Sequence, residues 1–175
     1  MNYLLGIDGS TVNTGWCIRD KDTLELVDGA EIIIDSKQES CMRTRVGYMI
    51  KEIEEIIDKY KPNEIIMEDV IPAINNGATV LALGILSGGV MELANSRNIA
   101  ISYVLPNIWQ SALGFKKSNG DLKKQSIDFV NNKFNKNYNY VSPSSKKNQD
   151  NLTDSVCITC WKLNDYKYKK FFGRR

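Results

Sequence analysis

The spacing of hydrophobic and polar residues predicts a mixed α/β chain. Short apolar runs bounded by turns or acids predict five strands, at residues 3–8, 14–19, 30–34, 64–68 and 99–105. Apolar residues at the i, i+3, i+4 spacing predict helices, over residues 42–60, 78–96, 121–134 and 150–163, with another beginning at Pro106. Three strands in succession, then alternating helices and strands, are typical of one mixed sheet flanked by helices.

The length of the chain favours one domain. Its 175 residues can bury one sizeable core and are too few for two ordinary ones. We expect a domain over residues 1–163 and a basic tail over residues 164–175. No charged leader opens the chain, and Ser87 and Glu92 interrupt its longest apolar stretch, residues 79–94. Neither a secretory signal nor a membrane span is therefore expected, and we predict a cytoplasmic protein.

The chemistry available to the chain is limited by its composition, because it contains no histidine. Triads with a histidine base and zinc sites with imidazole ligands are excluded. Cys157 and Cys160 have the CxxC spacing but lie alone in an apolar run. They are better explained as buried thiols in a reducing compartment than as a metal or redox site. Any catalysis must use carboxylates, lysines, hydroxyls, thiols or a bound metal ion.

Charge is distributed unevenly along the chain, although the net charge is only +2. Residues 1–115 hold 9 basic and 16 acidic residues, whereas residues 116–147 hold 8 lysines and two aspartates. The segment from residue 162 onward adds 6 basic residues and one aspartate. A basic second half beside an acidic first half suggests a polyanion held next to a carboxylate site. A solvated lysine-rich surface is the simpler alternative.

Carboxylates recur at the ends of the predicted elements. Asp8 ends the first strand, Glu68 ends the fourth, and Asp150 and Asp154 lie one helical turn apart in the last helix. Ligands of α/β sheets bind at the carboxyl ends of adjacent strands, so these side chains would meet if the first and fourth strands are neighbours. Converging carboxylates need a hard divalent cation, and oxygen ligands select Mg²⁺ or Mn²⁺.

Three segments resemble the motifs of one nuclease family. The segment GIDGSTVNTGW at residues 6–16 resembles the first motif of RuvC-type Holliday-junction resolvases, in the RNase H-like superfamily, with Gly9 where proline is usual. The strand IIME at residues 65–68 is similar to the second motif, and NLTDSV at residues 151–156 is similar to the last. The order and size of the family are kept, and a bacteriophage origin is favoured by the Asn- and Lys-rich composition.

The resemblance implies a five-stranded RNase H-like fold and a metal-dependent endonuclease that resolves Holliday junctions by paired symmetric nicks. Two Mg²⁺ ions, replaceable by Mn²⁺, would be held by catalytic carboxylates and would leave 5′-phosphate and 3′-hydroxyl ends. A homodimer is implied because a four-way junction is two-fold symmetric, with the small-residue helix over residues 78–96 in its interface. The expected metal ligands are Asp8, Glu68, Asp150 and Asp154, and the expected DNA-binding residues are Lys116, Lys117, Lys123 and Lys124.

Two departures from the family pattern affect these expectations. The family has an acid or histidine three residues before the final aspartate, where this chain has Asn151. We predict that the neighbouring Asp150 supplies this ligand through a small shift in the start of the helix. The segment after Glu68, residues 70–74, lacks the aromatic wedge that is frequent in the family, so junction distortion and sequence preference are not carried over.

Parts of the sequence are compatible with three further functions. The segment IDGST at residues 7–11 also resembles the phosphate loop of sugar kinases and actin-like ATPases, but those need two such domains around a nucleotide. We therefore expect no nucleotide cofactor. The same motifs would also suit a non-cleaving junction-binding protein, or a broader RNase H-like nuclease acting on forks, flaps or RNA–DNA hybrids.

Overall fold

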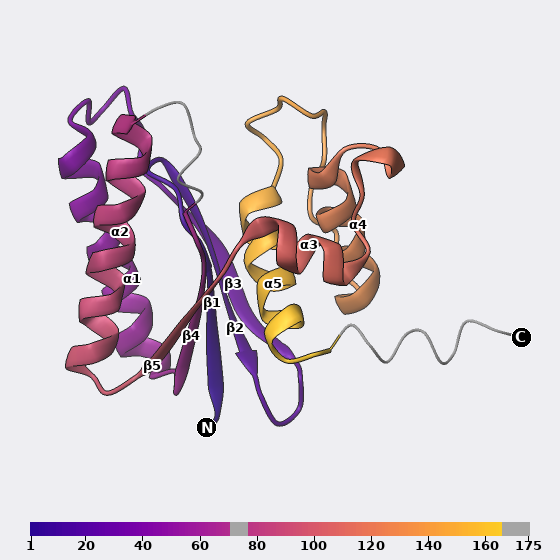
Figure 1. The fold of residues 1–175 in the computed structure, drawn as a ribbon, viewed down its shortest axis with the longest axis horizontal. Helices are drawn as coiled ribbons and strands as arrows, with labels where there is room; N and C mark the ends of the chain where they lie inside the picture. Colours follow the sequence, from indigo (N-terminus) through magenta and orange to yellow (C-terminus); the bar gives the residue numbers. More distant parts are fainter. Residues whose placement is uncertain (71–76, 166–175) are drawn as a thin grey trace, which may run out of the picture.

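The computed structural model describes residues 1–70 and 77–165, which form a five-stranded sheet between two layers of helices (Figure 1). The strands are β1 (Tyr3–Asp8), β2 (Asn13–Asp20), β3 (Leu26–Ile33), β4 (Glu64–Glu68) and β5 (Ala100–Val104). The helices are α1 (Met42–Tyr60), α2 (Gly77–Ser96), α3 (Pro106–Leu113), α4 (Leu122–Phe134) and α5 (Asp150–Lys162), with the 3₁₀ turn η1 (Lys117–Asn119). The strand order is β3-β2-β1-β4-β5.

The sheet is mixed, as predicted. Strands β1, β2 and β3 form an antiparallel meander, whereas β4 and β5 run parallel to β1 after helical crossovers. Alternate residues of each strand face opposite helical layers. Thus Leu5 and Ile7 join the core under α1 and α2, and Leu4 joins the core under α3, α4 and α5. Both faces of the sheet are therefore covered (Figure 1).

Helix α5 packs directly on the sheet because glycines leave room for it. A Cβ added at Gly15 of β2 would lie 1.9 Å from the carbonyl oxygen of Asn151. A Cβ added at Gly6 of β1 would lie 2.4 Å from Cγ2 of Thr159. The first turn of α5 is consequently held against the sheet near the end of β1.

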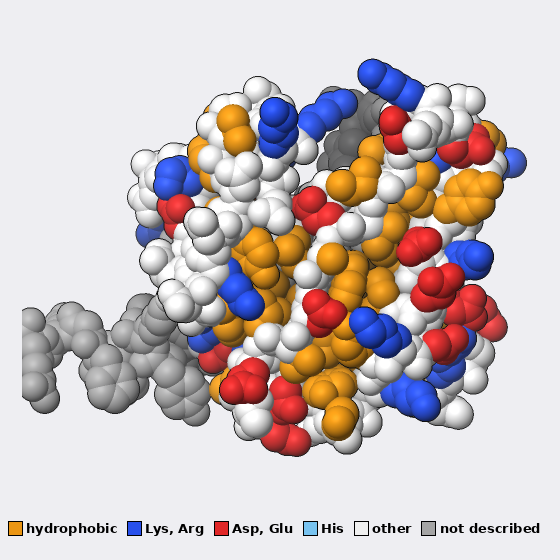
Figure 2. All heavy atoms as spheres, turned by 180° about the vertical axis from the view of Figure 1, so that it is seen from behind, with side chains coloured by type: hydrophobic (Ala, Val, Ile, Leu, Met, Phe, Trp, Pro, Cys, Tyr) orange, Lys and Arg blue, Asp and Glu red, His pale blue; other side chains and the backbone are white. Residues whose placement is uncertain are grey.

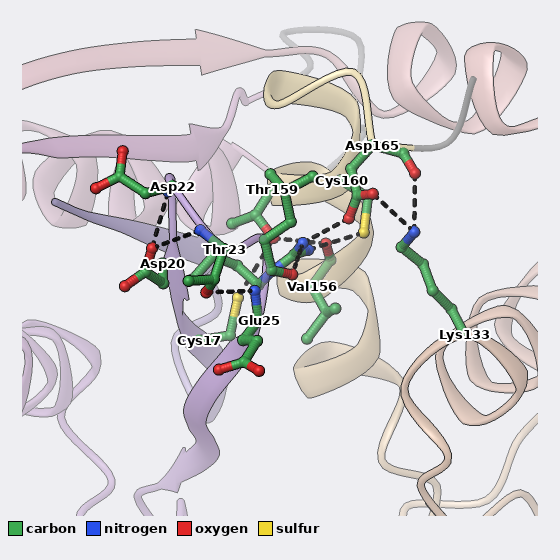
Figure 3. Close-up of polar contacts among 12 residues, drawn as sticks. Cys17, Asp20, Asp22, Thr23, Glu25, Lys133, Val156, Thr159, Cys160 and Asp165 are labelled. Carbon is green, nitrogen blue, oxygen red and sulfur yellow. Dashed lines mark hydrogen bonds and ion pairs between the residues drawn. The ribbon is translucent and has the colours of Figure 1, made fainter. Parts of the chain in front are cut away.

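The other end of α5 is anchored on β2 by a buried ion pair (Figure 3). The guanidinium of Arg19, which is fully buried, donates to the Asp165 carboxylate at 2.5 Å and to Sγ of Cys160 at 3.1 Å. Lys133 of α4 donates to the other Asp165 oxygen at 2.9 Å. The three helices α3, α4 and α5 thus form a layer in which α5 is fixed at both ends.

The two cysteines of the CxxC segment are buried thiols, as expected. Burial raises the pKa of Cys160 to about 11 and raises that of Cys157 well above its usual value. Thiols with raised pKa values are poor nucleophiles and poor metal ligands at neutral pH. The spacing therefore reflects the packing of one helix face.

Most predicted elements are confirmed to within one or two residues, with two differences. Strand β3 begins at Leu26, four residues earlier than predicted, because it is an edge strand whose exposed residues do not alternate regularly. The turn η1 was not predicted. Helix α2 spans 20 residues, and an 18-residue window within it has a mean hydropathy of 1.6, so by length and composition alone it is apolar enough to cross a membrane, a property that core helices of soluble proteins share.

Parts of two predicted segments lie outside the described residues. These are residues 71–74 of the segment after Glu68 and residues 166–175 of the basic tail.

Candidate active site

The first and fourth strands are neighbours, as the carboxylate site requires. Strands β1 and β4 pair in parallel, with Ile7 opposite Met67. The residues that follow, Asp8 and Glu68, therefore end adjacent strands at the same edge of the sheet. This is the edge where α/β sheets bind ligands.

Glu68 is held in place by an indole. Nε1 of Trp109, a buried residue of α3, donates to Oε2 of Glu68 at 2.8 Å. Burial raises the pKa of Glu68 to about 7, although the Trp109 hydrogen bond acts in the opposite direction. Its carboxyl group therefore titrates near neutral pH in the absence of a cation.

Asp8 lies in the field of four other acids. Its pKa is raised well above the usual value, first by burial and then by repulsion from Glu68, Asp154, Asp150 and Glu31. Acids that raise one another's pKa values lie close together in a poorly solvated place. The site therefore brings together acidic side chains from four separate parts of the chain, at residues 8, 31, 68 and 150–154.

Asp154 of α5 carries an unsatisfied oxygen. Burial raises its pKa well above the usual value, and the Glu68 and Asp150 charges raise it further, whereas a hydrogen bond from Ser126 lowers it. Its Oδ1 atom is buried and accepts no hydrogen bond from any residue that the structure describes. A buried acceptor without a partner is costly, so this oxygen is available to a ligand that supplies positive charge.

Asp150 is the first residue of α5 and is nearly buried, with 7% of its surface exposed. Its Oδ2 lies 2.8 Å from Nζ of Lys123, and this contact raises the pKa of the lysine. Asn151 instead packs its backbone against Gly15. The carboxylate of Asp150 is thus paired with a positively charged side chain of the protein, that of Lys123.

The four predicted DNA-binding lysines occupy different environments. Lys117 and Lys123, together with Asp154, line an open groove of about 470 Å³ at the N-terminus of α4. Lys124 pairs with Asp128 of its own helix at 2.5 Å. The backbone N–H of Lys116 donates to the Gln125 side chain. Of these four lysines, Lys123 is therefore the one that directly contacts a carboxylate of the site, that of Asp150.

The donor set fits a divalent cation, although its members are not gathered around one point. In residues 1–70 and 77–165, no three Asp, Glu or Cys side chains form a group ready to hold a metal ion. All donors are carboxylate oxygens, which suit Mg²⁺ and Mn²⁺. The raised pKa values of Asp8 and Asp154, and the unpaired oxygen of Asp154, are costs that a bound cation would remove.

Sequence reasoning missed three residues of the site, namely Trp109, Ser126 and Glu31. Trp109 and Ser126 contact the acids from α3 and α4 across more than 25 residues of sequence, a relation that local spacing does not reveal. Glu31 is the one acid within the β-branched run at residues 30–34, and this position was a signal that it had a partner.

Comparisons with known proteins point to one family. The family model described as crossover junction endodeoxyribonuclease RuvC matches residues 4–148. The RuvC protein of Rickettsia rickettsii (strain Sheila Smith) is 30% identical over 104 residues, which span 59% of this chain and 66% of that protein, just under two thirds of its length. The RuvC protein of Fusobacterium nucleatum is 28% identical, and its alignment spans 98% of this chain and 85% of that protein.

Solved structures show the same fold. The structure of T. thermophilus RuvC in complex with Holliday junction substrate superimposes with a TM-score of 0.69, covering 97% of this chain and 96% of that one at 15% identity. The Fowlpox virus resolvase in complex with Holliday junction DNA gives a TM-score of 0.59, covering 93% and 97% of the two chains at 14% identity. The RNase H-like fold expected from the sequence motifs is therefore confirmed.

Proposed function

Because this chain belongs to the RuvC family of crossover junction endodeoxyribonucleases, we propose that it cleaves Holliday junctions at the site formed by Asp8, Glu68, Asp150 and Asp154. The observation that carries the proposal is the electrostatic repulsion between acids of β1, β4 and α5: burial and the charges of Glu68, Asp154 and Asp150 raise the pKa of Asp8. Acids kept together at such a cost are typical of functional sites. A merely structural role would not require four acids close enough to repel one another in a poorly solvated environment.

The metal cofactor of the site is proposed to be Mg²⁺, with two ions per site and Mn²⁺ as a substitute. Asp8 would be the central ligand because its charge interacts with all the other acids. Glu68 is oriented for this purpose by Trp109, and Asp154 offers its unpaired Oδ1. When bound, such ions lower the pKa of the attacking water and offset the charge that develops on the phosphate.

The DNA strand would enter along the groove lined by Lys117 and Lys123. The first residues of α4 form one wall of this groove, and a helix N-terminus favours phosphate groups. Lys123 can exchange its contact with Asp150 for a phosphate once a cation occupies the carboxylates. Lys116 and Lys124 would contribute longer-range attraction, since Lys124 is already paired with Asp128.

The working unit is proposed to be a homodimer that uses the outer face of α2. Leu81, Ile85 and Met91 are exposed on this helix although they are large and apolar. Gly84 and Gly88 lie between them, and a Cβ added at either would meet nothing within 4 Å. Contiguous exposed apolar surface indicates an interaction site, and a second copy would place two active sites on a two-fold symmetric junction.

The proposal is tested with end-labelled four-way junctions, replication forks, flaps and linear duplexes, incubated with the protein and Mg²⁺ or with EDTA. We expect paired symmetric nicks in the four-way junction, with 5′-phosphate ends, only when Mg²⁺ or Mn²⁺ is present. Asp8→Asn should lose more than about 100-fold of the cleavage rate, which exceeds the usual effect of residues outside a metal's ligand sphere. Glu55→Gln, which removes one exposed acid of α1 in the other helical layer, is the matched control and should cleave normally.

Each competing function has its own outcome in this experiment. Equal cleavage of forks, flaps and four-way junctions would replace the resolvase with a broader branched-DNA nuclease. Tight binding of the junction without cleavage, in the presence of either metal, would identify a non-cleaving junction-binding protein. Full activity of Asp8→Asn would overturn the assignment of the site.

A further inference from the structure

Glu31 occupies the same row of the sheet as the proposed catalytic acids. Asp8 of β1 pairs with Gly15 of β2, and Gly15 pairs with Glu31 of β3. Residues paired across adjacent strands point to the same face of a sheet. Asp8 and Glu31 therefore both point toward α5, separated by a glycine that has no side chain.

The first turn of α5 lies over this glycine. A Cβ at Gly15 would overlap the backbone of Asn151, and a Cβ at Gly29 would lie 2.9 Å from Cδ1 of Leu152. Glu31 thus stands beside the N-terminus of α5, whereas Asp8 stands beneath it on the other side. The space above Gly15 is filled by the helix backbone itself.

The N-terminus of α5 lacks the usual local cap. Gln149 is the N-cap residue, and its side chain makes no capping hydrogen bond but accepts one from the backbone N–H of Asn139. The first hydrogen bond within the helix runs from the N–H of Thr153 to the Gln149 carbonyl. The preceding N–H, that of Leu152, is one of the groups that a helix leaves unpaired. Oε1 of Glu31 accepts it at 3.5 Å.

Glu31 is itself held by the first residue of β2, the strand that lies between β3 and β1. The side chain of Asn13 hydrogen-bonds to the Glu31 carboxylate, and this bond lowers the pKa of Glu31, whereas burial raises it. The Glu31 carboxylate thereby connects the start of β2 to the first turn of α5. Strand β2 pairs with β1, whose last residue is Asp8, and α5 carries Asp150 and Asp154.

We propose that Glu31 is a positioning residue that caps α5 from the neighbouring strand and so sets where Asp150 and Asp154 stand relative to Asp8. The inference rests on the proposed function, because it explains how the acids are aligned. An N-cap residue of α5 would fix only the helix, whereas a cap from β3 also fixes the helix against the sheet. This chain has Asn151 at the position where its family has an acid or histidine, and the cap determines which face of α5 meets Asp8.

The test compares Glu31→Ala and Glu31→Gln with Asp28→Ala. Gln can still accept the Leu152 N–H, whereas Ala cannot. Asp28→Ala is the matched control. Asp28 lies on the same strand and accepts a hydrogen bond from the Tyr60 hydroxyl on the opposite side of the sheet, so its replacement also removes one side-chain hydrogen bond but leaves the site untouched. Amide hydrogen exchange is measured on the metal-free proteins, and junction cleavage and junction binding are measured with Mg²⁺.

We expect the Leu152 amide of Glu31→Ala to exchange roughly five- to tenfold faster than in the parent protein, as for loss of a cap. The cleavage rate at saturating junction should fall about 10- to 100-fold, as for a residue that orients metal ligands, while junction affinity stays within about twofold. Glu31→Gln should retain most of the rate and the exchange protection. Asp28→Ala should change neither.

Three results would overturn the inference. They are unchanged Leu152 exchange in Glu31→Ala, a loss of cleavage no larger than that of Asp28→Ala, and a Glu31→Gln variant as inactive as Glu31→Ala, which would show that the charge and not the hydrogen bond is needed. Because hydrogen exchange is measured without metal or DNA, the cap is tested even if the parent protein fails to cleave junctions. Failure of the proposed function is therefore distinguishable from failure of this inference.

Discussion

At the scale of single residues, Glu68 shows how the site is kept ready for a cation. Burial opposes ionisation of its carboxyl group, whereas the hydrogen bond from Trp109 favours the ionised form. Burial has the larger effect, and the pKa rises from 4.5 to about 7. In the metal-free protein, ionised Glu68 is therefore a source of instability near neutral pH. A bound divalent cation would supply the charge that the environment lacks.

This balance predicts that the metal-free protein is more stable in weak acid than in weak base. A carboxyl group whose pKa is raised on folding contributes stability that is complete below its unfolded pKa of about 4.5 and is lost as pH rises through about 7. A pKa difference of this size corresponds to about 3 kcal/mol in the free energy of unfolding, of which about 2 kcal/mol is lost between pH 5.5 and pH 8. Urea unfolding of the EDTA-treated protein at pH 5.5 and pH 8 measures it.

Glu68→Gln is the control for this prediction, because its amide oxygen can still accept the Trp109 N–H while position 68 no longer carries a titratable group. The variant should lose the part of the pH dependence between pH 5.5 and pH 8 that Glu68 contributes, and keep the part that Asp8 and Asp154 contribute. Saturating Mg²⁺ should have a similar effect on the parent protein, since it favours the ionised form. A parent protein that is equally stable at both pH values without metal would contradict the assignment of the buried acids.

At the scale of elements, α5 is the element on which the site depends most, because the sheet beneath it has no side chain in the way. At Gly15 the backbone of β2 and that of α5 approach so closely that a methyl group would overlap the Asn151 carbonyl. Neither partner can move as a flexible side chain could. The glycine therefore determines the height of Asp150 and Asp154 above Asp8.

Gly15→Ala should consequently destabilise the protein and impair cleavage together. Overpacking of a filled interior costs about 1–3 kcal/mol, and a backbone contact of this kind belongs at the upper end. Gly47→Ala is the matched control, since Gly47 lies in α1 and an added Cβ would meet nothing within 4 Å. This variant should be more stable than the parent by about 0.5–1 kcal/mol, because Ala has a higher helix propensity than Gly. Thermal unfolding measures the stability of both variants, and junction cleavage measures their activity. A Gly15→Ala variant as stable and active as the parent would show that α5 is not packed so closely.

The elements themselves were largely predictable from the sequence, because their signals are local. The apolar spacing of α1 and the Pro62 that follows it predicted Met42–Tyr60 in full, and the acids at the ends of β1 and β4 were apparent from their position. What was not predictable depends on contacts between distant segments. Glu31 reaches Leu152 across 121 residues, and Trp109 reaches Glu68 across 41. No local pattern encodes which strand ends beside which helix start.

At the scale of the whole molecule, the two helical layers present different surfaces to solvent. The layer of α3, α4 and α5 covers the carboxylates and carries the lysine-lined groove. In the layer of α1 and α2, the residues Ala82, Leu86, Val90 and Ala94 of α2 are buried, and its opposite face is exposed and apolar. Seen from behind, further hydrophobic side chains lie between the two layers (Figure 2). The face of α2 is distinguished by its small residues at helical spacing, which permit close approach of a second helix.

We therefore expect the protein to be a dimer that Leu81→Glu dissociates. Leu81 is 51% exposed, so the substitution should leave the fold intact while placing a charge on each side of the two-fold axis. Sedimentation at micromolar concentration should show the mass of two chains for the parent and one for the variant. Paired nicking of the four-way junction should fall more than about tenfold, because each monomer then cuts independently.

Ile33→Glu is the control for the dimer, since Ile33 is 67% exposed on the edge strand β3, away from α2. It should leave both mass and paired nicking unchanged. A monomeric parent protein that nevertheless makes paired nicks would contradict the role of α2 in assembly. Because α2 is also long and apolar enough to enter a bilayer, flotation with phospholipid vesicles belongs in the same experiment. Migration of the parent protein with the vesicles, abolished by Leu81→Glu, would assign the exposed face to lipid instead of to a second copy.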